Sequence, residues 1–306
     1  TPPPRTTQRI ELEGVEPVSA PPVPSPSPPT WVAVRSEPAP PEPPQVNRAG
    51  SYSLARQLGL GVKRIVIDAG HGGHDPGTIG HNGLQEKDLV LDVALRLDRL
   101  VRSELGAETL LTRSGDVFVP LEERTAIANS KGADLFLSIH ANSSRNRSVR
   151  GIETYYLSFA QDPHAEEVAA RENAVSAATI KDLQNLVKAI TLNSKIDESR
   201  DFAASVQEAM ISRLHPEHPR IEDRGTRTAP FYVLIGANMP SVLAEIAFVS
   251  NPEEERMLKA ADHRERIARS LLDGVRAYLS ALNRTQTRKL TGTPSGPKLA
   301  AGGSRR

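Results

Sequence analysis

The sequence predicts a single three-layer α/β domain, because short apolar runs alternate with longer amphipathic segments. Several of the apolar runs are nearly continuous, which is typical of central strands covered on both faces. Prolines gather before Arg48, outside this alternating pattern. We therefore expect the folded domain to span residues 62–283.

Six segments are predicted to form strands. Each is a short run rich in aliphatic, aromatic or β-branched residues. They are residues 64–68, 108–112, 135–140, 151–157, 231–234 and 241–248. The first, third and last are nearly continuous apolar runs, so we expect them to be central strands.

Four longer segments are predicted to form helices, at residues 86–104, 121–130, 199–214 and 263–282. In the first of them, Leu89, Val93 and Leu97 recur at helical spacing, with Arg and Asp between them. Pro252 is followed by three glutamates, which is typical of an acidic first turn and predicts one more short helix.

Both ends of the chain are predicted to be disordered. Residues 1–61 form a proline-rich linker that buries too little apolar surface to offset the ordering of its backbone. Residues 284–306 form a basic tail rich in Gly, Ser, Thr and Lys. Because the chain begins at Thr1 without an initiator Met or a signal peptide, we expect a mature or truncated form whose linker leads to an upstream module.

The composition narrows the classes of function. The formal net charge is +1, so the overall charge gives no indication of nucleic-acid binding. No run approaches the ~20 apolar residues of a membrane-spanning helix. The chain has no cysteine, which excludes disulfides and thiolate metal sites and is compatible with an exported protein.

The first candidate site is a loop dense in Gly, His and Asp that follows the first predicted strand. It runs from Asp68 to Gly77 and contains His71. Loops at the ends of parallel strands are where α/β sites assemble, and glycine lets the backbone turn sharply and come close to a ligand. The alternative interpretation is a tight turn with one solvent-exposed histidine.

Two more residues could complete a metal-ligand set. His140 closes an apolar strand, and Glu86 opens a long helix. With His71 they make the two-histidine, one-carboxylate set that leaves one zinc position open for water. Each has a structural alternative, because His140 could be a core histidine and Glu86 could simply complement the helix dipole. Their spacing is long and decides little by itself.

Glu245 is the strongest single candidate because it lies inside an apolar strand. A carboxylate buried in a strand is costly unless it is paired or functional. Burial would raise its pKa, which suits a general base that takes a proton from a metal-bound water. The alternative is a buried ion pair with Arg113, Arg124 or Arg227.

These segments, in this order, resemble the zinc-dependent N-acetylmuramoyl-L-alanine amidases, a family that includes the amidases of daughter-cell separation. The resemblance extends over residues 63–282. It rests on IDAGHGG at 67–73, GLQEKD at 83–88, LTR at 111–113, SIHAN at 138–142, GIETYY at 151–156, FYVL at 231–234 and EIAFVSN at 245–251. Any one motif is weak, but seven in register are highly specific.

The resemblance implies that one Zn²⁺ is bound by His71, Glu86 and His140 and that Glu245 is the catalytic acid/base. It also implies a mixed sheet of about six strands flanked by helices. The reaction would be hydrolysis of the amide between N-acetylmuramic acid and the L-alanine of the stem peptide. Zinc would polarise the lactyl carbonyl and lower the pKa of its bound water, and Glu245 would carry the proton to the leaving amine.

Three further residues are candidates for supporting the metal ligands or contacting the substrate: Asp68, Arg113 and Asn142. Asp68 could orient a ligand from behind, as residues around metal sites often do. The alternative is that Asp68 only caps the turn.

A long insert, at about residues 160–195, separates the strand at 151–157 from the helix at 199–214. The division-associated amidases resemble this chain in having a helical insert that covers the zinc site until an activator protein displaces it. We therefore hypothesise an autoinhibitory insert in which Glu166, Glu167 or Glu172 fills the open zinc position. The alternative is a lid or packing helix without control, because sequence does not show whether a helix is bistable.

Two other functions fit the same residues. A zinc carboxypeptidase acting on small peptides would need a positive clamp for a free carboxylate, for which Arg113 or Arg227 is available. An inactive cell-wall-binding module is the second, although all four expected polar residues are present. Peptidoglycan is the expected partner, with a monomer in the periplasm or elsewhere in the cell envelope as the expected state.

Overall fold

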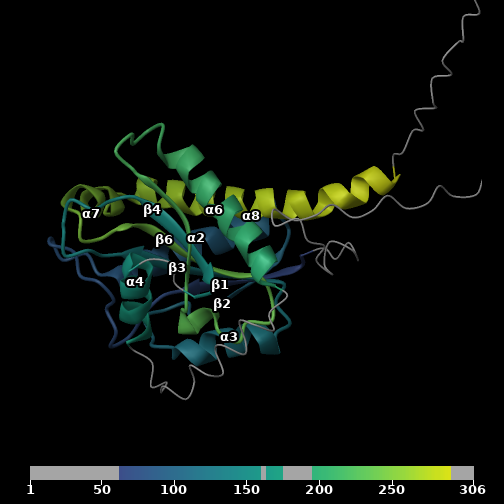
Figure 1. The fold of residues 1–306 in the computed structure, drawn as a ribbon, viewed down its shortest axis with the longest axis horizontal. Coiled ribbons are helices and arrows are strands. Elements are labelled where there is room, and N and C mark those ends of the chain that lie inside the picture. The colour runs from purple at the N-terminus through teal and green to yellow at the C-terminus, as the bar shows by residue number, and fades with distance from the viewer. Residues whose placement is uncertain (1–61, 160–162, 175–194, 291–306) are drawn as a thin grey trace, which may run out of the picture. The chain divides into compact units, whose positions relative to one another are not determined.

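The computed structural model describes residues 62–159, 163–174 and 195–290, and within them a six-stranded mixed sheet has the order β2-β1-β3-β6-β4-β5 (Figure 1). The strands are β1 (Arg64–Ala69), β2 (Glu108–Leu111), β3 (Leu135–Asn142), β4 (Ile152–Leu157), β5 (Asp223–Ala229) and β6 (Ser241–Phe248). The predicted α/β class and mixed sheet are confirmed. The predicted linker at 1–61 and residues 160–162 and 175–194 of the predicted insert lie outside the described residues.

Strand direction brings polar residues to one edge of the sheet. β2, β1, β3 and β6 run parallel, so their carboxyl ends meet at that edge. β4 is antiparallel to β6 and parallel to β5, so the amino ends of β4 and β5 lie there too. In this register His140, Glu245 and Glu153 are lateral neighbours on three adjacent strands.

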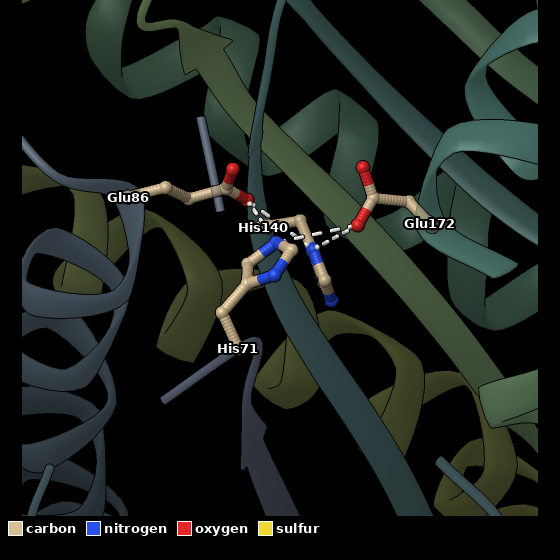
Figure 2. Close-up of side chains that lie close together, drawn as sticks. All are labelled: His71, Glu86, His140 and Glu172. Atoms are coloured by element: carbon tan, nitrogen blue, oxygen red, sulfur yellow. Dashed lines mark ion pairs between the residues drawn. The ribbon is translucent and has the colours of Figure 1, made fainter. Parts of the chain in front are cut away.

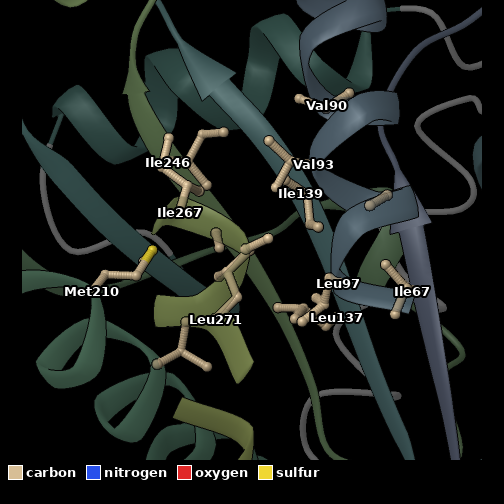
Figure 3. Close-up of a cluster of buried hydrophobic side chains, with 14 of the residues drawn as sticks. Ile67, Val90, Val93, Leu97, Leu137, Ile139, Met210, Ile246, Ile267 and Leu271 are labelled. Atoms are coloured by element: carbon tan, nitrogen blue, oxygen red, sulfur yellow. The ribbon is translucent and has the colours of Figure 1, made fainter. Parts of the chain in front are cut away.

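Side-chain alternation divides the core into two layers, one on each face of the sheet. On one face, Ile67, Leu137 and Ile246 pack against α2 (Glu86–Glu104), α6 (Ile196–Leu214) and α8 (Ala261–Leu290), as Figure 3 shows. Each of these fully buried aliphatic side chains contributes roughly 1.5–3 kcal/mol of burial free energy. This layer fixes the strands that carry the site.

The opposite face of the sheet is covered by shorter elements. These are α3 (Leu121–Ser130), α4 (Pro163–Asn173) and the 3₁₀ helix η1 (Tyr232–Leu234). Val66, Phe136 and Leu243, which alternate with the residues of the first layer, pack here. The polar row of His140, Glu245 and Glu153 faces this thinner layer and therefore lies near α4.

The prediction of a strand at 231–234 is wrong. That segment contains η1, and the sixth strand is instead β5, whose sequence DRGTRTA has no apolar run. β5 is an edge strand with mostly exposed or half-buried side chains, so it carries no apolar pattern. The apolar character of 231–234 has another cause, because Phe231 is fully buried against the ring of Tyr155, with centroids 5.0 Å apart.

Helix positions agree more closely with the predictions. α2 and α3 have the predicted bounds, and the short helix at Pro252 is α7 (Pro252–Leu258), whose first turn is capped by the Asn251 side chain. α6 begins before the predicted residue 199. α8 continues to Leu290, past the predicted domain end at residue 283. Within the described residues, no helix combines the length and apolar character needed to cross a membrane.

Candidate metal centre

Four buried side chains meet at the edge of the sheet where the parallel strands end (Figure 2). They are His71, Glu86, His140 and Glu172, and one ligand atom from each lies within 4.8 Å of the others. Oε1 of Glu86 is 3.1 Å from His71 Nε2 and 3.2 Å from His140 Nδ1. Oε2 of Glu172 is 3.3 Å and 3.1 Å from the same two nitrogens. The two imidazoles are thus flanked by two carboxylates around a common point.

The four residues come from four different elements. His71 follows β1, His140 lies on β3, Glu86 is the first residue of α2, and Glu172 is near the end of α4. β1 and β3 are parallel neighbours, so both histidines lie at the same edge of the sheet. The predicted set of His71, Glu86 and His140 is therefore brought together, with Glu172 added from the insert.

The backbone of His71 has an uncommon conformation. Its φ is 57°, in the left-handed region that non-glycine residues rarely adopt. Its Nδ1 lies 2.8 Å from Oδ2 of Asp75, which fixes the ring orientation and turns Nε2 toward the other three side chains. Backbone strain of this kind persists only where the surroundings hold it, and it tends to mark functional sites.

Two glycines leave room for the ligand side chains. A Cβ on Gly70 would lie 2.4 Å from Cε1 of His140, and a Cβ on Gly77 would lie 2.6 Å from Cδ2 of His71. Gly77 also has a φ of +63°. The glycines of the loop are therefore needed for close approach to the histidine rings, in addition to the turn that the sequence predicts.

Glu86 is fixed through both oxygens. Oε1 accepts a hydrogen bond from the main-chain N–H of Ala141 at 2.9 Å, and Oε2 accepts one from the N–H of Thr78 at 2.9 Å. Burial by itself would raise the pKa of Glu86, but His71 and His140 lower it to about 2. Glu86 is thus an ionised and immobile carboxylate.

The cluster fits a bound cation. His71 Nε2, His140 Nδ1 and Glu172 Oε2 are buried and have no hydrogen-bond partner among the described residues, although each faces the common point. Burial disfavours a charged His140, yet the facing carboxylates of Glu172 and Glu86 raise its pKa to about 9. A centre that favours positive charge and offers two imidazole nitrogens and two carboxylate oxygens matches the ligand chemistry of zinc and similar divalent metals.

Glu245 lies beside this centre on β6. It is fully buried, and neither carboxylate oxygen has a hydrogen-bond partner within the described part of the chain. Burial and the nearby Glu172 raise the pKa of Glu245 well above its usual value, while His140 and Arg171 oppose the shift. The buried ion pair proposed as its structural alternative is absent, because Arg113, Arg124 and Arg227 bond to other groups.

Glu153, the other lateral neighbour of Glu245, was not among the predicted site residues. It is fully buried, and its Oε1 accepts from Asn142 Nδ2 at 2.7 Å and pairs with His164 Nε2 at 2.8 Å. Its Oε2 lies 2.9 Å from Nε of Arg227. The signal that identified Glu245, a carboxylate within an apolar strand, was also present here in the GIETYY motif.

Asp68 supports the site indirectly. Its Oδ1 accepts from Thr112 Oγ1 at 2.6 Å and Arg124 Nη1 at 2.8 Å, and its Oδ2 accepts from Ser138 Oγ at 2.7 Å. Although burial opposes ionisation, these groups hold the pKa of Asp68 below its usual value. Arg124 in turn donates to the carbonyl of His71 at 2.9 Å. Asp68 therefore holds the arginine that fixes the His71 backbone.

Arg113 also supports the loop, and its buried guanidinium is held by main-chain carbonyls. It donates to the carbonyls of Ala69 at 2.9 Å and Gly70 at 2.6 Å. Two more of its N–H groups donate to further main-chain carbonyls, those of Lys87 and Gly115. With Arg227 paired to Glu153, neither arginine suggested as the clamp of a carboxypeptidase is unpaired.

The insert helix α4 closes over the site with several contacts. Arg171 donates to the side-chain oxygen of Asn142 at 2.7 Å and to the carbonyl of Ser143 at 2.9 Å. Of the three predicted inhibitory glutamates, Glu172 reaches His71 and His140, whereas Glu166 and Glu167 are exposed. The three glutamates point in different directions around α4, so the face on which α4 packs decides which of them reaches the histidines. The sequence of α4 did not predict that face.

Comparison with known proteins identifies the family. The sequence model of the N-acetylmuramoyl-L-alanine amidases matches residues 65–277. The chain is 38% identical over 240 residues to N-acetylmuramoyl-L-alanine amidase AmiA of Escherichia coli K12, covering 75% of this chain and 81% of AmiA. It is 36% identical over 232 residues to amidase LytC of Bacillus subtilis, covering 75% of this chain and 38% of LytC.

Solved structures of N-acetylmuramoyl-L-alanine amidases are also similar to this chain. Amidase AmiC2 of Nostoc punctiforme superposes with a TM-score of 0.55 at 30% identity, over 71% of this chain and 97% of AmiC2. The catalytic domain of the amidase CwlV from Bacillus (Paenibacillus) polymyxa gives 0.54 at 31% identity, over 72% of this chain and 99% of that domain. The protein is therefore an α/β peptidoglycan hydrolase. The chain belongs to the N-acetylmuramoyl-L-alanine amidase family, and its reaction is hydrolysis of the N-acetylmuramoyl–L-alanine amide.

Proposed function

We propose that this amidase works with a zinc ion held by His71, Glu86 and His140, with Glu245 as general acid/base, and that helix α4 inhibits it. The observation that carries the proposal is the convergence of four ligand atoms, three of them without a hydrogen-bond partner, beside one buried carboxylate that also lacks such partners among the described residues. Three protein ligands and one open position are the usual arrangement of a catalytic zinc.

When bound, zinc supplies Lewis-acid polarisation of the substrate carbonyl and lowers the pKa of a water molecule. The residues of the chain move the protons. Glu245 accepts a proton from the attacking water as the new C–O bond forms. It then delivers that proton to the nitrogen of L-alanine as the C–N bond breaks, so the products are the lactyl carboxylate and a free stem peptide. General acid–base catalysis of this kind contributes roughly 10²–10⁴-fold in rate.

The surroundings of Glu245 suit this role. A carboxyl that must both accept and donate a proton works best when its pKa lies near the working pH. Burial, the largest cause, pushes the pKa of Glu245 upward, in that direction. Glu86, in contrast, accepts two main-chain hydrogen bonds and stays ionised as a ligand. The two carboxylates thus have environments that separate their roles.

The position of Glu172 supports the proposed inhibition. Its Oε2 faces both histidines, so a metal held by the other three residues would find its fourth position filled by protein. Arg171 and His164 add contacts to Ser143 and Glu153 that hold α4 in place. We propose that an activator protein displaces α4 and opens the site. The competing role for α4 is that of a lid or packing helix without control.

The proposal is tested by digesting purified peptidoglycan with the full chain carrying Glu172→Ala, which lacks the proposed inhibitory carboxylate, and reading the products by mass spectrometry. Stem peptides that begin with L-alanine should appear, and should disappear on chelation. Glu245→Gln should lower the rate at least about 100-fold while metal content stays unchanged. If Glu245→Gln retains most of the activity, the acid/base role is excluded.

Inhibition is tested separately with variants of α4. Glu172→Ala should raise the basal rate, whereas the matched control Glu167→Ala, on the exposed side of the same helix, should leave it unchanged. Deletion of residues 162–193 should raise it further. Equal basal rates in the parent chain, the two point variants and the deletion variant would exclude autoinhibition. The amidase assignment would be unaffected. Because the substrate is peptidoglycan, we further propose that the protein acts in the periplasm or elsewhere in the cell envelope.

A further inference from the structure

Asn173, the last residue of α4, makes two side-chain hydrogen bonds to main-chain groups of the segment around Phe231. The carboxamide of Asn173 donates from Nδ2 to the carbonyl of Pro230 at 2.9 Å and accepts at Oδ1 from the N–H of Tyr232 at 2.8 Å. A carbonyl and an N–H that flank one extended residue are the pair with which a strand binds one residue of a parallel neighbour. Asn173 thus occupies a site shaped for peptide backbone.

The segment that offers these two groups is rigid. Phe231, between them, is extended with φ −70° and ψ 123°, and its ring is fully buried against Tyr155. The next turn is closed by hydrogen bonds from the N–H of Leu234 to the carbonyl of Phe231 and from the N–H of Ile235 to that of Tyr232, each at 3.0 Å. The carbonyl and N–H therefore keep their direction without help from Asn173.

The location of this pair relates it to the metal centre. Asn173 directly follows Glu172, whose carboxylate faces the two histidines, and consecutive Cα atoms are ~3.8 Å apart. The backbone pair at Pro230 and Tyr232 therefore bonds to the residue that follows the one facing the candidate metal position. Within the described residues, Asn173 is the partner of both groups.

We propose that the carbonyl of Pro230 and the N–H of Tyr232 form a subsite for the stem peptide, which binds there in an extended conformation once α4 has left. One residue of the peptide would donate its N–H to Pro230 and accept from Tyr232 with its carbonyl, as the Asn173 carboxamide does in the closed state. This inference rests on the proposed displacement of α4. Recognition through main-chain groups reads the peptide's backbone and leaves its side chains unselected at that residue.

The subsite can be altered at one atom. Tyr232→Pro removes the N–H, and proline is compatible with this position because Tyr232 is the first residue of η1 and Phe231 already has the extended conformation that precedes proline. Tyr232→Ala is the matched control, since it removes the same side chain and keeps the N–H. Both are made in the full chain carrying Glu172→Ala and Asn173→Ala, so that no closed-state contact of Tyr232 with Asn173 remains to be lost.

The first measurement is hydrolysis of a synthetic N-acetylmuramoyl tripeptide. Loss of one hydrogen bond to the substrate should lower kcat/KM of the Tyr232→Pro protein about tenfold relative to Tyr232→Ala. Values within twofold of each other, in two proteins of equal thermal stability, overturn the subsite and leave the amidase function intact.

A second measurement does not require the proline variant to fold. The chain has five tyrosines, so selective ¹⁵N-tyrosine labelling gives at most five backbone amide signals, and Tyr232 is assigned by its loss in Tyr232→Ala. In the Glu172→Ala, Asn173→Ala, Glu245→Gln protein, the free stem tripeptide should shift the Tyr232 amide proton downfield and leave that of buried Tyr278 unmoved. An unmoved Tyr232 signal at saturating peptide overturns the proposal. A shifted signal without hydrolysis by the Glu245-containing protein would support the subsite and refute the proposed catalysis.

Discussion

Replacing Asp68 with Asn tests whether the buried pair with Arg124 holds the metal loop. Asp68 and Arg124 are both almost fully buried, and their charged atoms are 2.8 Å apart. The substitution keeps the shape of the side chain but leaves the guanidinium without its counter-ion. Removing one partner of a buried ion pair costs roughly 3–5 kcal/mol. For a domain of this size, a loss of 1 kcal/mol lowers Tm by about 2–4 °C, so we expect a fall of about 6–20 °C.

The same substitution should weaken metal binding. Arg124 donates to the carbonyl of His71, whose φ of 57° needs such support. Loss of a supporting contact behind a metal ligand typically lowers affinity by about 10–100-fold. Calorimetric unfolding and zinc titration of Asp68→Asn measure the two effects. Thr112→Val is the control, because it removes one of three hydrogen bonds to Asp68 and should cost only about 1–3 kcal/mol. A Tm within 2 °C of the parent, or unchanged zinc affinity, would refute the reasoning.

Three other outcomes are expected. Gly70→Ala should displace the His140 ring and lower metal content after dialysis. Gly115→Ala, whose added Cβ would lie in open space, should retain the metal. Equal metal content in both proteins would contradict the packing argument. Chelation should lower Tm, since a metal at 100 times its Kd stabilises the folded state by about 2.7 kcal/mol, and an unchanged Tm would speak against a bound ion. Burial, together with His218 and Arg266, lowers the pKa of His263 from 6.5 to about 4. The contribution of neutral His263 to the free energy of unfolding is therefore full above pH 6.5. It is lost as the pH falls toward 4, by about 3 kcal/mol in all. His263→Gln should flatten the unfolding free energy over that range, and an unaltered slope would disprove the assignment.

Local pattern was sufficient for most of the fold and for three residues of the candidate metal centre. β6 and helices α2 and α3 have the predicted bounds because apolar periodicity reports directly which side of an element is buried. His71, Glu86 and His140 were found because polar residues at the ends of parallel strands and of the adjoining helix converge at one edge. Glu245 stood out because an unpaired carboxylate in an apolar strand is energetically costly.

Tertiary structure decided what local pattern does not encode. β5 is a polar edge strand held by backbone hydrogen bonds to β4, so its sequence gave no strand signal, and residues 231–234 are apolar because they pack on Tyr155. The docking of α4 selected Glu172 over Glu166 and Glu167, which share its helix and its chemistry.

The partners of the buried charges were also set by the fold. Asp68 pairs with Arg124, 56 positions away along the chain. Glu153 contacts Asn142, His164 and Arg227, which come from three separate elements. Sequence by itself determined which elements form most of the sheet and placed His71, Glu86, His140 and Glu245 among the candidate residues, because apolar periodicity and strand ends can be read along the chain. Only the tertiary structure decided which charge faces which, because electrostatic energies depend on distances of a few ångströms that separation along the chain does not specify.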